Sequence, residues 1–294
     1  MNGSPLWSTP DPLRLRSDVE RLAVVRHPDA APDALRAAED FVALELGAAG
    51  LRVERQLFAW QGREFHNVVA TNDGRNPARP WVVVGAHFDS TAHTPGADDN
   101  ASAVAAMLEV ARLLAGWRPA ATVQFVGFNL EEVQRRLPPA FRLGSRAYAE
   151  RLRADGRELA GALVLEMVGF TGPHQRVPAA VKLVKRIPKE GTFLAAVGDA
   201  NSRRLLGVME RAAEGVIELV TLEVPFKGYV VPDTRRSDNA RFWDQDYPSL
   251  MVTDTADLRN PHYHLASDTP ETLDYAFMGK VVTAVVRAVR ALAE

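Results

Sequence analysis

The stretch WVVVGAHFDS, residues 81–90, decides which fold this sequence predicts. Its first six residues are apolar throughout, which is typical of a strand covered on both faces of a parallel sheet. His87 and Asp89 follow directly, so an imidazole and a carboxylate are expected at the carboxyl edge of that sheet. Open α/β sheets build their binding sites at this edge. A second acidic pair, Asp98-Asp99, comes shortly afterwards at the start of a predicted helix of small residues.

Strands and helices are predicted to alternate along the rest of the chain. This alternation indicates an α/β fold, with a mostly parallel, mixed central sheet and helices on both faces. The predicted strands lie near residues 52–59, 67–71, 81–86, 122–128, 162–167, 192–197, 217–223 and 249–253, and the predicted helices near 33–47, 101–116, 145–152, 201–213, 239–243 and 270–293.

No linker divides the chain, so we expect a single domain over all 294 residues. Residues 1–30 are expected to form an N-terminal extension and the first helix. The last helix is predicted to be capped by Asp268 or Thr269, with Pro270 at its first position.

The composition limits the possible functions. A net charge of -2 offers no basic excess for a nucleic-acid partner. No apolar run approaches membrane-spanning length, and the first residues lack the apolar core of a signal peptide. We therefore expect a cytoplasmic protein without a membrane partner. The chain has no cysteine, so any metal must be bound by histidine, aspartate or glutamate.

Further carboxylates follow apolar strands at the expected sheet edge. Adjacent carboxylates are usually just solvated, but Glu131-Glu132 follow the strand at 122–128 directly. Neighbouring side chains at a strand exit point in different directions, so one can bind a metal while the other accepts a proton from water. Glu166 ends another apolar strand, where a carboxylate is either a helix-end anchor or a ligand.

The histidines differ in their surroundings. His262 and His264 both follow the strand at 249–253, and either is a ligand candidate by composition. The other histidines are interpreted as structural, surface or loop residues: His27, His66, His93 and His174.

Three irregular stretches are long enough to suggest functional loops, namely residues 129–143, 171–191 and 225–237. The middle stretch carries several lysines and arginines, which favours a solvated surface loop.

Taken together, these motifs resemble the co-catalytic two-zinc aminopeptidases, a family that includes related carboxypeptidases and the glutaminyl cyclases. The resemblance runs from about Glu54 to the C-terminus and lies in the order and spacing of the whole set. The motifs are His87-x-Asp89, Gly96-Ala97-Asp98-Asp99-Asn100-Ala101-Ser102, Glu131-Glu132, Glu166, Ser237-Asp238 and His264-x-x-x-Asp268-Thr269.

The resemblance implies two bound zinc ions, for which Mn²⁺ or Co²⁺ could substitute. Asp99 would bridge the two ions. His87 and Glu166 would complete the protein ligands of one ion. Glu132 and His264 would complete those of the other.

The resemblance also implies roles for residues that do not bind metal. Glu131 would be the general base, which takes a proton from water and passes it to the leaving amine. Tyr263 would steady the tetrahedral oxyanion, as in some members of the family. Asp89 would orient His87 from behind, and Asp238 would be a further supporting acid.

Three features depart from the family pattern. Position 166 is Glu where many members have Asp, which lengthens the ligand arm. Position 239 is Asn where Ser-Asp-His is usual, so a supporting histidine is missing. The loop at 133–139 is longer and more basic than in small members, and we expect it to shape the substrate pocket.

The implied function is a zinc-dependent exopeptidase, and more specifically an aminopeptidase acting on peptides with a free N-terminus. Glu131 and Glu166 are the candidates for holding the α-amino group. A glutaminyl cyclase-like aminoacyltransferase is an alternative on the same fold. The resemblance implies Asp-Ser at the bridging position and Trp before the last histidine in such cyclases, whereas this chain has Asp99-Asn100 and Tyr263. A non-catalytic relative is a third possibility, although such proteins usually lack part of the ligand set.

Overall fold

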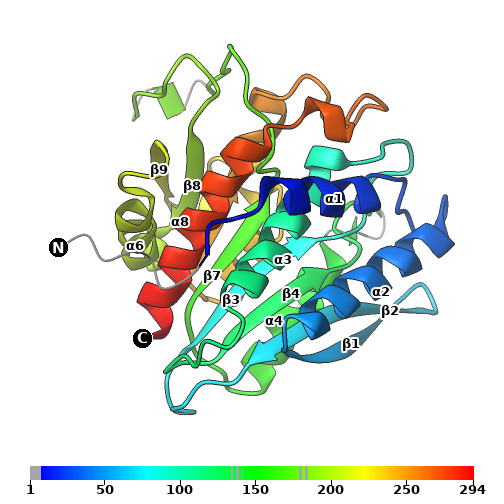
Figure 1. Ribbon diagram of the computed structural model, residues 1–294, viewed down its shortest axis with the longest axis vertical. Helices are drawn as coiled ribbons and strands as arrows, with labels where there is room; N and C mark the ends of the chain where they lie inside the picture. The colour runs from blue at the N-terminus through cyan, green and yellow to red at the C-terminus, as the bar shows by residue number, and fades with distance from the viewer. Residues whose placement is uncertain (1–7, 134, 137–138, 141, 179–180, 183–184) are drawn as a thin grey trace.

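The computed structural model describes residues 8–133, 135–136, 139–140, 142–178, 181–182 and 185–294. Eight strands form one sheet in the order β1-β2-β4-β3-β7-β10-β8-β9 (Figure 1). They are β1 (Arg52–Trp60), β2 (Arg63–Asn72), β3 (Trp81–His87), β4 (Val123–Phe128), β7 (Leu159–Glu166), β8 (Leu194–Asp199), β9 (Leu219–Val224) and β10 (Ser249–Thr253). The short strands β5 (Arg135–Arg136) and β6 (Pro139–Ala140) pair separately.

The four strands at the centre of the sheet, β4, β3, β7 and β10, run parallel. β3 lies between β4 and β7, so the chain pairs first on one side of β3 and later on the other. A sheet whose strand order changes direction in this way has a crevice at the carboxyl ends of its strands. The prediction of a mostly parallel, mixed sheet is confirmed, and β1–β2, β2–β4 and β8–β10 are its antiparallel pairs.

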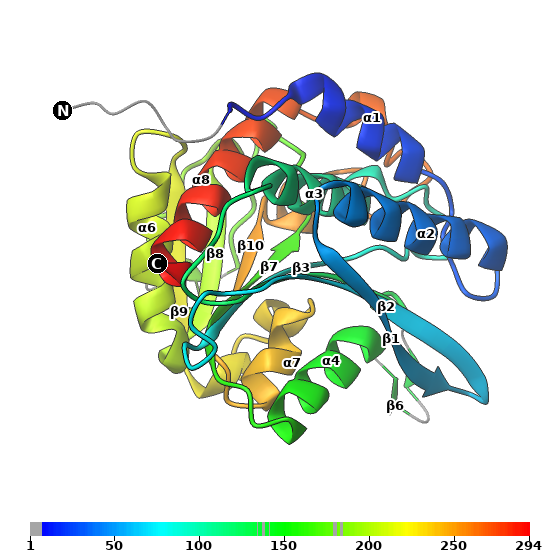
Figure 2. The same cartoon turned by 60° about the horizontal axis from the view of Figure 1, so that its bottom comes forward.

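The central strands are buried on both faces, as the unbroken apolar run in β3 predicts. Val82 and Val84 belong to the larger core, whereas Val83 packs into a second core with Phe128 and Tyr148. Figure 2 shows the two helical layers, with α4 and α7 on the side of the sheet opposite α2, α3 and α8. The helices are α1 (Pro12–Leu22), α2 (Pro32–Ala48), α3 (Ala103–Leu113), α4 (Leu143–Ala154), α6 (Arg203–Ala213), α7 (Asn239–Asp244) and α8 (Tyr275–Ala293). Among the described residues, no helix is long and apolar enough to cross a membrane.

The C-terminal helix α8 begins later than predicted. Pro270 opens a short 3-10 turn instead, and the extended backbone of Leu273 separates that turn from α8. The cap is Asp274, whose carboxylate accepts the backbone N–H of Phe277 at 2.9 Å. The predicted cap at Asp268 or Thr269 is therefore wrong. Asp268 instead binds backbone groups in the site described next.

Candidate metal centre

The side chains that the sequence singles out meet at the carboxyl edge of the central strands. β3 ends at His87, β7 ends at Glu166, and Glu131-Glu132 follow the end of β4. His264 lies in the long connection between β10 and α8. Because the carboxyl ends of parallel strands share one edge, the topology brings these distant parts of the sequence together.

Five of these side chains form two groups that could each hold a metal ion. The first group is His87, Asp99 and Glu166, the second is Asp99, Glu132 and His264, and the donor atoms of each lie within 4.8 Å of one another. Asp99 belongs to both: Oδ1 lies 3.5 Å from Nε2 of His87, and Oδ2 lies 3.0 Å from Nε2 of His264. The structure thus brings together all five predicted ligands, with Asp99 between the two histidines.

The two glutamates of these groups each approach one histidine. Oε1 of Glu132 lies 3.1 Å from Nε2 of His264. Oε1 of Glu166 lies 3.5 Å from Nε2 of His87, so the longer arm at position 166 still reaches the first group. The other oxygen of Glu166 accepts a hydrogen bond from the Ser237 hydroxyl, which ties the predicted Ser237-Asp238 motif to this donor.

Asp268 holds the backbone of the segment that carries Asp99. Its two oxygens accept the N–H groups of Asp98 and Asp99 at 2.9 and 3.1 Å. Asp268 is fully buried, and this burial together with the charge of Asp98 raises its pKa to about 7. Because both oxygens have backbone partners, the carboxylate can occupy this buried position and fix the Asp99 backbone.

Arg26 fixes the loop between β3 and the helical turn η1 (Ala97–Ser102). Its buried guanidinium donates to the carbonyl oxygens of Phe88, Pro95 and Gly96 at 2.7, 2.7 and 3.1 Å. Gly96 has a φ of 62°, and an added Cβ would overlap the carbonyl oxygen of Asp99. Only glycine fits at this position. The loop is therefore fixed by buried contacts directly before Asp99.

The Asp98–Ser102 motif also binds the backbone that follows Glu166. Three successive N–H groups donate to its side chains: Met167 to Asn100 Oδ1 at 2.8 Å, Val168 to Ser102 Oγ at 3.0 Å, and Gly169 to Asp98 Oδ1 at 2.9 Å. Asp98 lies in the first turn of η1 and in neither donor group. The motif thus fixes two predicted ligands relative to each other.

Asp89 contacts both His87 and the backbone of Glu131-Glu132. Its Oδ1 lies 3.5 Å from Nδ1 of His87, and its backbone carbonyl oxygen lies 3.3 Å from the same nitrogen. Its two oxygens also accept the backbone N–H groups of Glu131 and Glu132 at 3.0 and 2.9 Å. The second contact is not evident from the sequence, and it fixes the predicted base and its neighbour together.

Backbone strain lies next to the donors. Leu130, Met167 and His264 have φ values of 59°, 46° and 58°, although none of them is glycine. Left-handed backbone of this kind is costly and is concentrated at functional sites, where the surrounding structure holds it. All three residues adjoin or belong to the predicted ligand and base positions.

The carboxylates carry more charge than the two histidines balance. Burial raises the pKa of Glu131 well above its usual range, although the charge of His87 opposes this. Burial and the charge of Asp99 raise the pKa of Glu132 to about 8. Burial lowers the pKa of His264, but hydrogen bonds to Asp99 and Glu132 outweigh it and bring the value to about 10. Such crowding of buried carboxylates around imidazoles fits a site for divalent cations.

Four of the five predicted ligands line a polar cleft of about 560 Å³ together with Glu131, namely Asp99, Glu132, Glu166 and His264. The remaining lining residues are Pro232 and five cationic or aromatic residues, Arg142, Arg235, Arg236, Tyr229 and Tyr263. The ring of Tyr263 stacks on that of His264, with centroids 3.8 Å apart, at the edge of the donors. Behind the donors, Asp238 is fully buried, and this burial raises its pKa to about 7.

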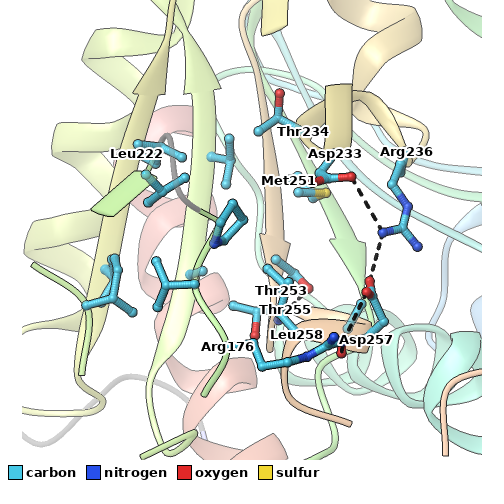
Figure 3. Close-up of a pocket in the computed structure, with 18 of the residues that line it drawn as sticks. Arg176, Leu222, Asp233, Thr234, Arg236, Met251, Thr253, Thr255, Asp257 and Leu258 are labelled. Atoms are coloured by element: carbon cyan, nitrogen blue, oxygen red, sulfur yellow. Dashed lines mark hydrogen bonds and ion pairs between the residues drawn. The ribbon is translucent and has the colours of Figure 1, made fainter. Parts of the chain in front are cut away.

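A second, apolar pocket of about 140 Å³ adjoins the cleft and shares Glu166, Arg236 and Tyr263 with it. Figure 3 shows Leu222 and Met251 among its walls, to which β8, β9 and β10 each contribute. Residues of the stretch 171–191 complete the wall, including Val177, Pro178, Val181 and Ile187. The interpretation of that stretch as a solvated surface loop is confirmed for its described lysines and arginines, which are exposed, but not for the apolar side chains that line the pocket.

In the loop at 133–139, which the sequence predicts to shape the substrate pocket, residues 134 and 137–138 lie outside the described residues, so this stays a prediction. Other contributors to the site were not evident from the sequence. Arg26 lacks any local signal, because its carbonyl partners become neighbours only in the fold. Asn260 donates to Oδ2 of Asp98 at 2.7 Å, and its place just before His262 and His264 was the one available hint.

Comparison with known proteins shows the family to which this chain belongs. The sequence model of peptidase family M28 matches residues 67–289, so the chain belongs to peptidase family M28. The chain is 33% identical to the uncharacterized protein YfbL of Escherichia coli (strain K12), over 96% of this chain and 89% of that protein. It is 29% identical to a probable leucine aminopeptidase 1 of Trichophyton verrucosum, over 78% of this chain but only 58% of the fungal protein.

The fold is similar to those of two solved structures with different activities in their names. An aminopeptidase from Aneurinibacillus sp. strain AM-1 has a TM-score of 0.73 and 16% identity, covering 97% of this chain and 95% of that one. A glutaminyl cyclase from Tannerella forsythia has a TM-score of 0.71 and 20% identity, covering 96% and 99%. At these identities the likeness shows the fold alone.

Proposed function

We propose that this protein is a zinc-dependent aminopeptidase that binds two metal ions. The observation that carries the proposal is the position of Asp99, whose two oxygens face the histidines of two separate donor groups. Glu131 lies in neither group yet lines the same cleft, where a proton acceptor is needed. Membership in a peptidase family supports hydrolysis of a peptide bond as the reaction.

In this proposal His87 and Glu166 would hold one ion, Glu132 and His264 would hold the other, and Asp99 would touch both. Imidazole and carboxylate donors without cysteine suit zinc, and Mn²⁺ or Co²⁺ are possible substitutes. Bound cations of this kind polarise the scissile carbonyl and make a shared water more acidic.

Glu131 would act as the general base. One of its carboxylate oxygens takes a proton from the attacking water and then gives it to the amide nitrogen, so that the C–N bond breaks and the amine leaves neutral. Burial raises the pKa of Glu131. Asp89 supports this role because it holds the backbone of Glu131.

The hydroxyl of Tyr263 would donate a hydrogen bond to the oxyanion that develops on the carbonyl. A donor aimed at developing charge stabilises the transition state more than the ground state. The stacked ring of His264 supports this role, because it fixes the plane of the phenol beside a predicted ligand.

The apolar pocket would receive the first side chain of the substrate. Glu166 lines both this pocket and the cleft, and Glu131 lines the cleft, so either carboxylate could pair with a free α-ammonium group between them. The pocket walls are mainly aliphatic and aromatic, which favours leucine-like or phenylalanine-like first residues. The names of the fungal relatives, as leucine aminopeptidases, agree with this preference.

A screen of amino-acid amides and short peptides tests the proposal. The purified protein is assayed with added zinc, after chelation, and after zinc is restored, and every peptide has an N-acetylated counterpart. We expect zinc-dependent release of apolar N-terminal residues from the free peptides only. Equal cleavage of the acetylated peptides would contradict aminopeptidase activity.

A peptide that begins with glutamine extends the same screen to cyclisation, because a glutaminyl cyclase shares this fold. Mass spectrometry separates the two outcomes, since cyclisation loses ammonia and hydrolysis loses a whole residue. We expect loss of a residue. A protein that binds no zinc at all, by elemental analysis, would instead favour a non-catalytic relative.

A further inference from the structure

Arg236 lies where the polar cleft meets the apolar pocket, and it lines both. Its Nη2 donates a hydrogen bond of 2.9 Å to the Tyr263 oxygen, and its Nη1 donates one of 2.8 Å to Oδ1 of Asp257. We propose that Arg236 is a positioning residue that directs the hydroxyl proton of Tyr263 into the cleft. This inference rests on the proposed function, in which Tyr263 donates to the oxyanion.

The direction of the hydrogen bond carries the inference. A guanidinium group has donors only, so the phenol oxygen of Tyr263 must be the acceptor. A phenol has a single proton, which cannot point at a group that is itself donating. The proton therefore points away from Arg236. The stacking on His264, at an interplanar angle of 20°, fixes the ring and limits the directions that remain. Tyr263 lines both the cleft and the apolar pocket, but only the cleft offers the carboxylates of Asp99 and Glu132, so an oxyanion bound beside them lies on the side left free for the proton.

The charge of Arg236 adds to this effect. The guanidinium carbon lies 5.4 Å from the centroid of the Tyr263 ring, so a positive charge lies close to the phenol. A hydroxyl that accepts from a cation becomes a stronger donor, because the bonds of such a chain polarise one another. Arg236 therefore both orients the proton of Tyr263 and strengthens its donation to an oxyanion.

Carboxylates on the pocket rim hold Arg236 in place. Figure 3 shows Arg236 between Asp233 and Asp257, at 3.8 and 2.8 Å, with Arg176 on the far side of Asp257. Ion pairs this exposed contribute little to folding stability. Replacing Arg236 should therefore leave the fold intact, which makes the functional tests direct.

An NMR experiment tests the contact itself without any activity. The chain has five tyrosines, so labelling with ¹³Cζ-tyrosine gives few signals, and Tyr263→Phe assigns the one that matters. We expect Arg236→Ala to shift the Tyr263 signal. Arg203→Ala is the control, because Arg203 makes a similar ion pair with Glu223 away from the cleft. An unchanged Tyr263 signal in Arg236→Ala would overturn the inference.

A double-mutant cycle tests the consequence for the reaction. We expect Tyr263→Phe to lower kcat by about 10²-fold, the scale of one lost oxyanion donor, and Arg236→Ala by about tenfold. The double variant should be no slower than Tyr263→Phe alone, because Arg236 acts through the hydroxyl that is already gone. KM and zinc content should stay near the parent values. Added guanidinium ion should restore part of the rate of Arg236→Ala but not of the double variant.

Independent effects of the two substitutions on kcat would contradict the inference even if the parent enzyme is an aminopeptidase. If the parent enzyme cleaves no peptide, the proposed function fails, and the NMR signal still decides whether Arg236 donates to Tyr263. The two failures are therefore distinguishable.

Discussion

The two halves of this site are held by different kinds of contact. At the sheet edge, Asp89 and Asp268 are completely buried, and each accepts two backbone N–H groups next to predicted ligands. Along the apolar pocket, ion pairs between exposed groups form the rim, where the side chains of Arg176 and Asp233 are 69% and 57% exposed.

This difference indicates which half tolerates substitution. Breaking a buried hydrogen bond to a charged group is costly, whereas most exposed ion pairs add little to stability. The donors are therefore fixed in position, while the pocket wall can vary without loss of the fold. We expect changes at the sheet edge to affect metal binding, and changes at the pocket to affect the choice of substrate.

The largest effect is expected at Asp99, the donor that both groups share. Asp99→Ala should lose both metal ions and reduce peptide cleavage to background, as elemental analysis and the peptide assay would measure. Asp40→Ala is the control, because Asp40 is an exposed carboxylate paired with Arg55. If Asp99→Ala keeps one ion at full occupancy, the two groups are independent and the carboxylate is not shared.

A smaller effect is expected at Asp268, which holds the Asp99 backbone. Asp268→Asn keeps the size of the side chain but turns an N–H donor towards another N–H. Because such supporting contacts orient ligands, zinc affinity should fall by about 10–100-fold. Competition with a chromophoric chelator measures this affinity. An unchanged affinity would show that the Asp99 segment does not need Asp268.

In the pocket half, we expect a change of specificity. Ala195 on β8 lines the apolar pocket, and Ala195→Phe should fill part of it. The value of kcat/KM for leucine or phenylalanine at the first position should fall by about 10–200-fold, the scale for one misfit in an apolar pocket. Cleavage of alanyl substrates by the same variant is the internal control, and it should be nearly preserved. Equal losses for all substrates would place this pocket outside substrate selection.

The smallest effect is expected at the start of α8, outside both halves. Asp274→Ala removes the helix cap and should lower the free energy of unfolding by about 0.5–2 kcal/mol. Thr269→Ala should change it little, because Thr269 makes no side-chain cap hydrogen bond. Urea unfolding of the two variants measures the difference. A larger loss of unfolding free energy for Thr269→Ala than for Asp274→Ala would mean that the helix is capped by Thr269 and begins at Pro270.

Much of the sheet-edge half could be predicted from the sequence. His87 and Glu166 end apolar strands, and Glu131-Glu132 follow another, so the order of apolar strands and helices alone predicts that they share one edge. The roles of Arg26 and Asp268 could not be predicted in this way. Their partners are backbone groups, and only the folded chain brings those groups within reach.

The pocket half was largely beyond prediction. Its wall combines β8, β9 and β10 with Val177 and Ile187 from a stretch whose basic residues suggested solvent exposure. The start of α8 illustrates a similar limit. Asp268 and Asp274 are both plausible caps locally, and the extended backbone at Leu273 decides between them.

The proposed mechanism makes Glu131 the general base, while other residues bind the two metal ions. The most direct test measures metal content and kcat in one preparation of Glu131→Gln. Our account predicts two zinc ions per chain, as in the parent protein, with kcat lower by about 10²–10⁴-fold, the scale for a lost general base. A variant that binds both ions and cleaves peptides at the parent rate would contradict it.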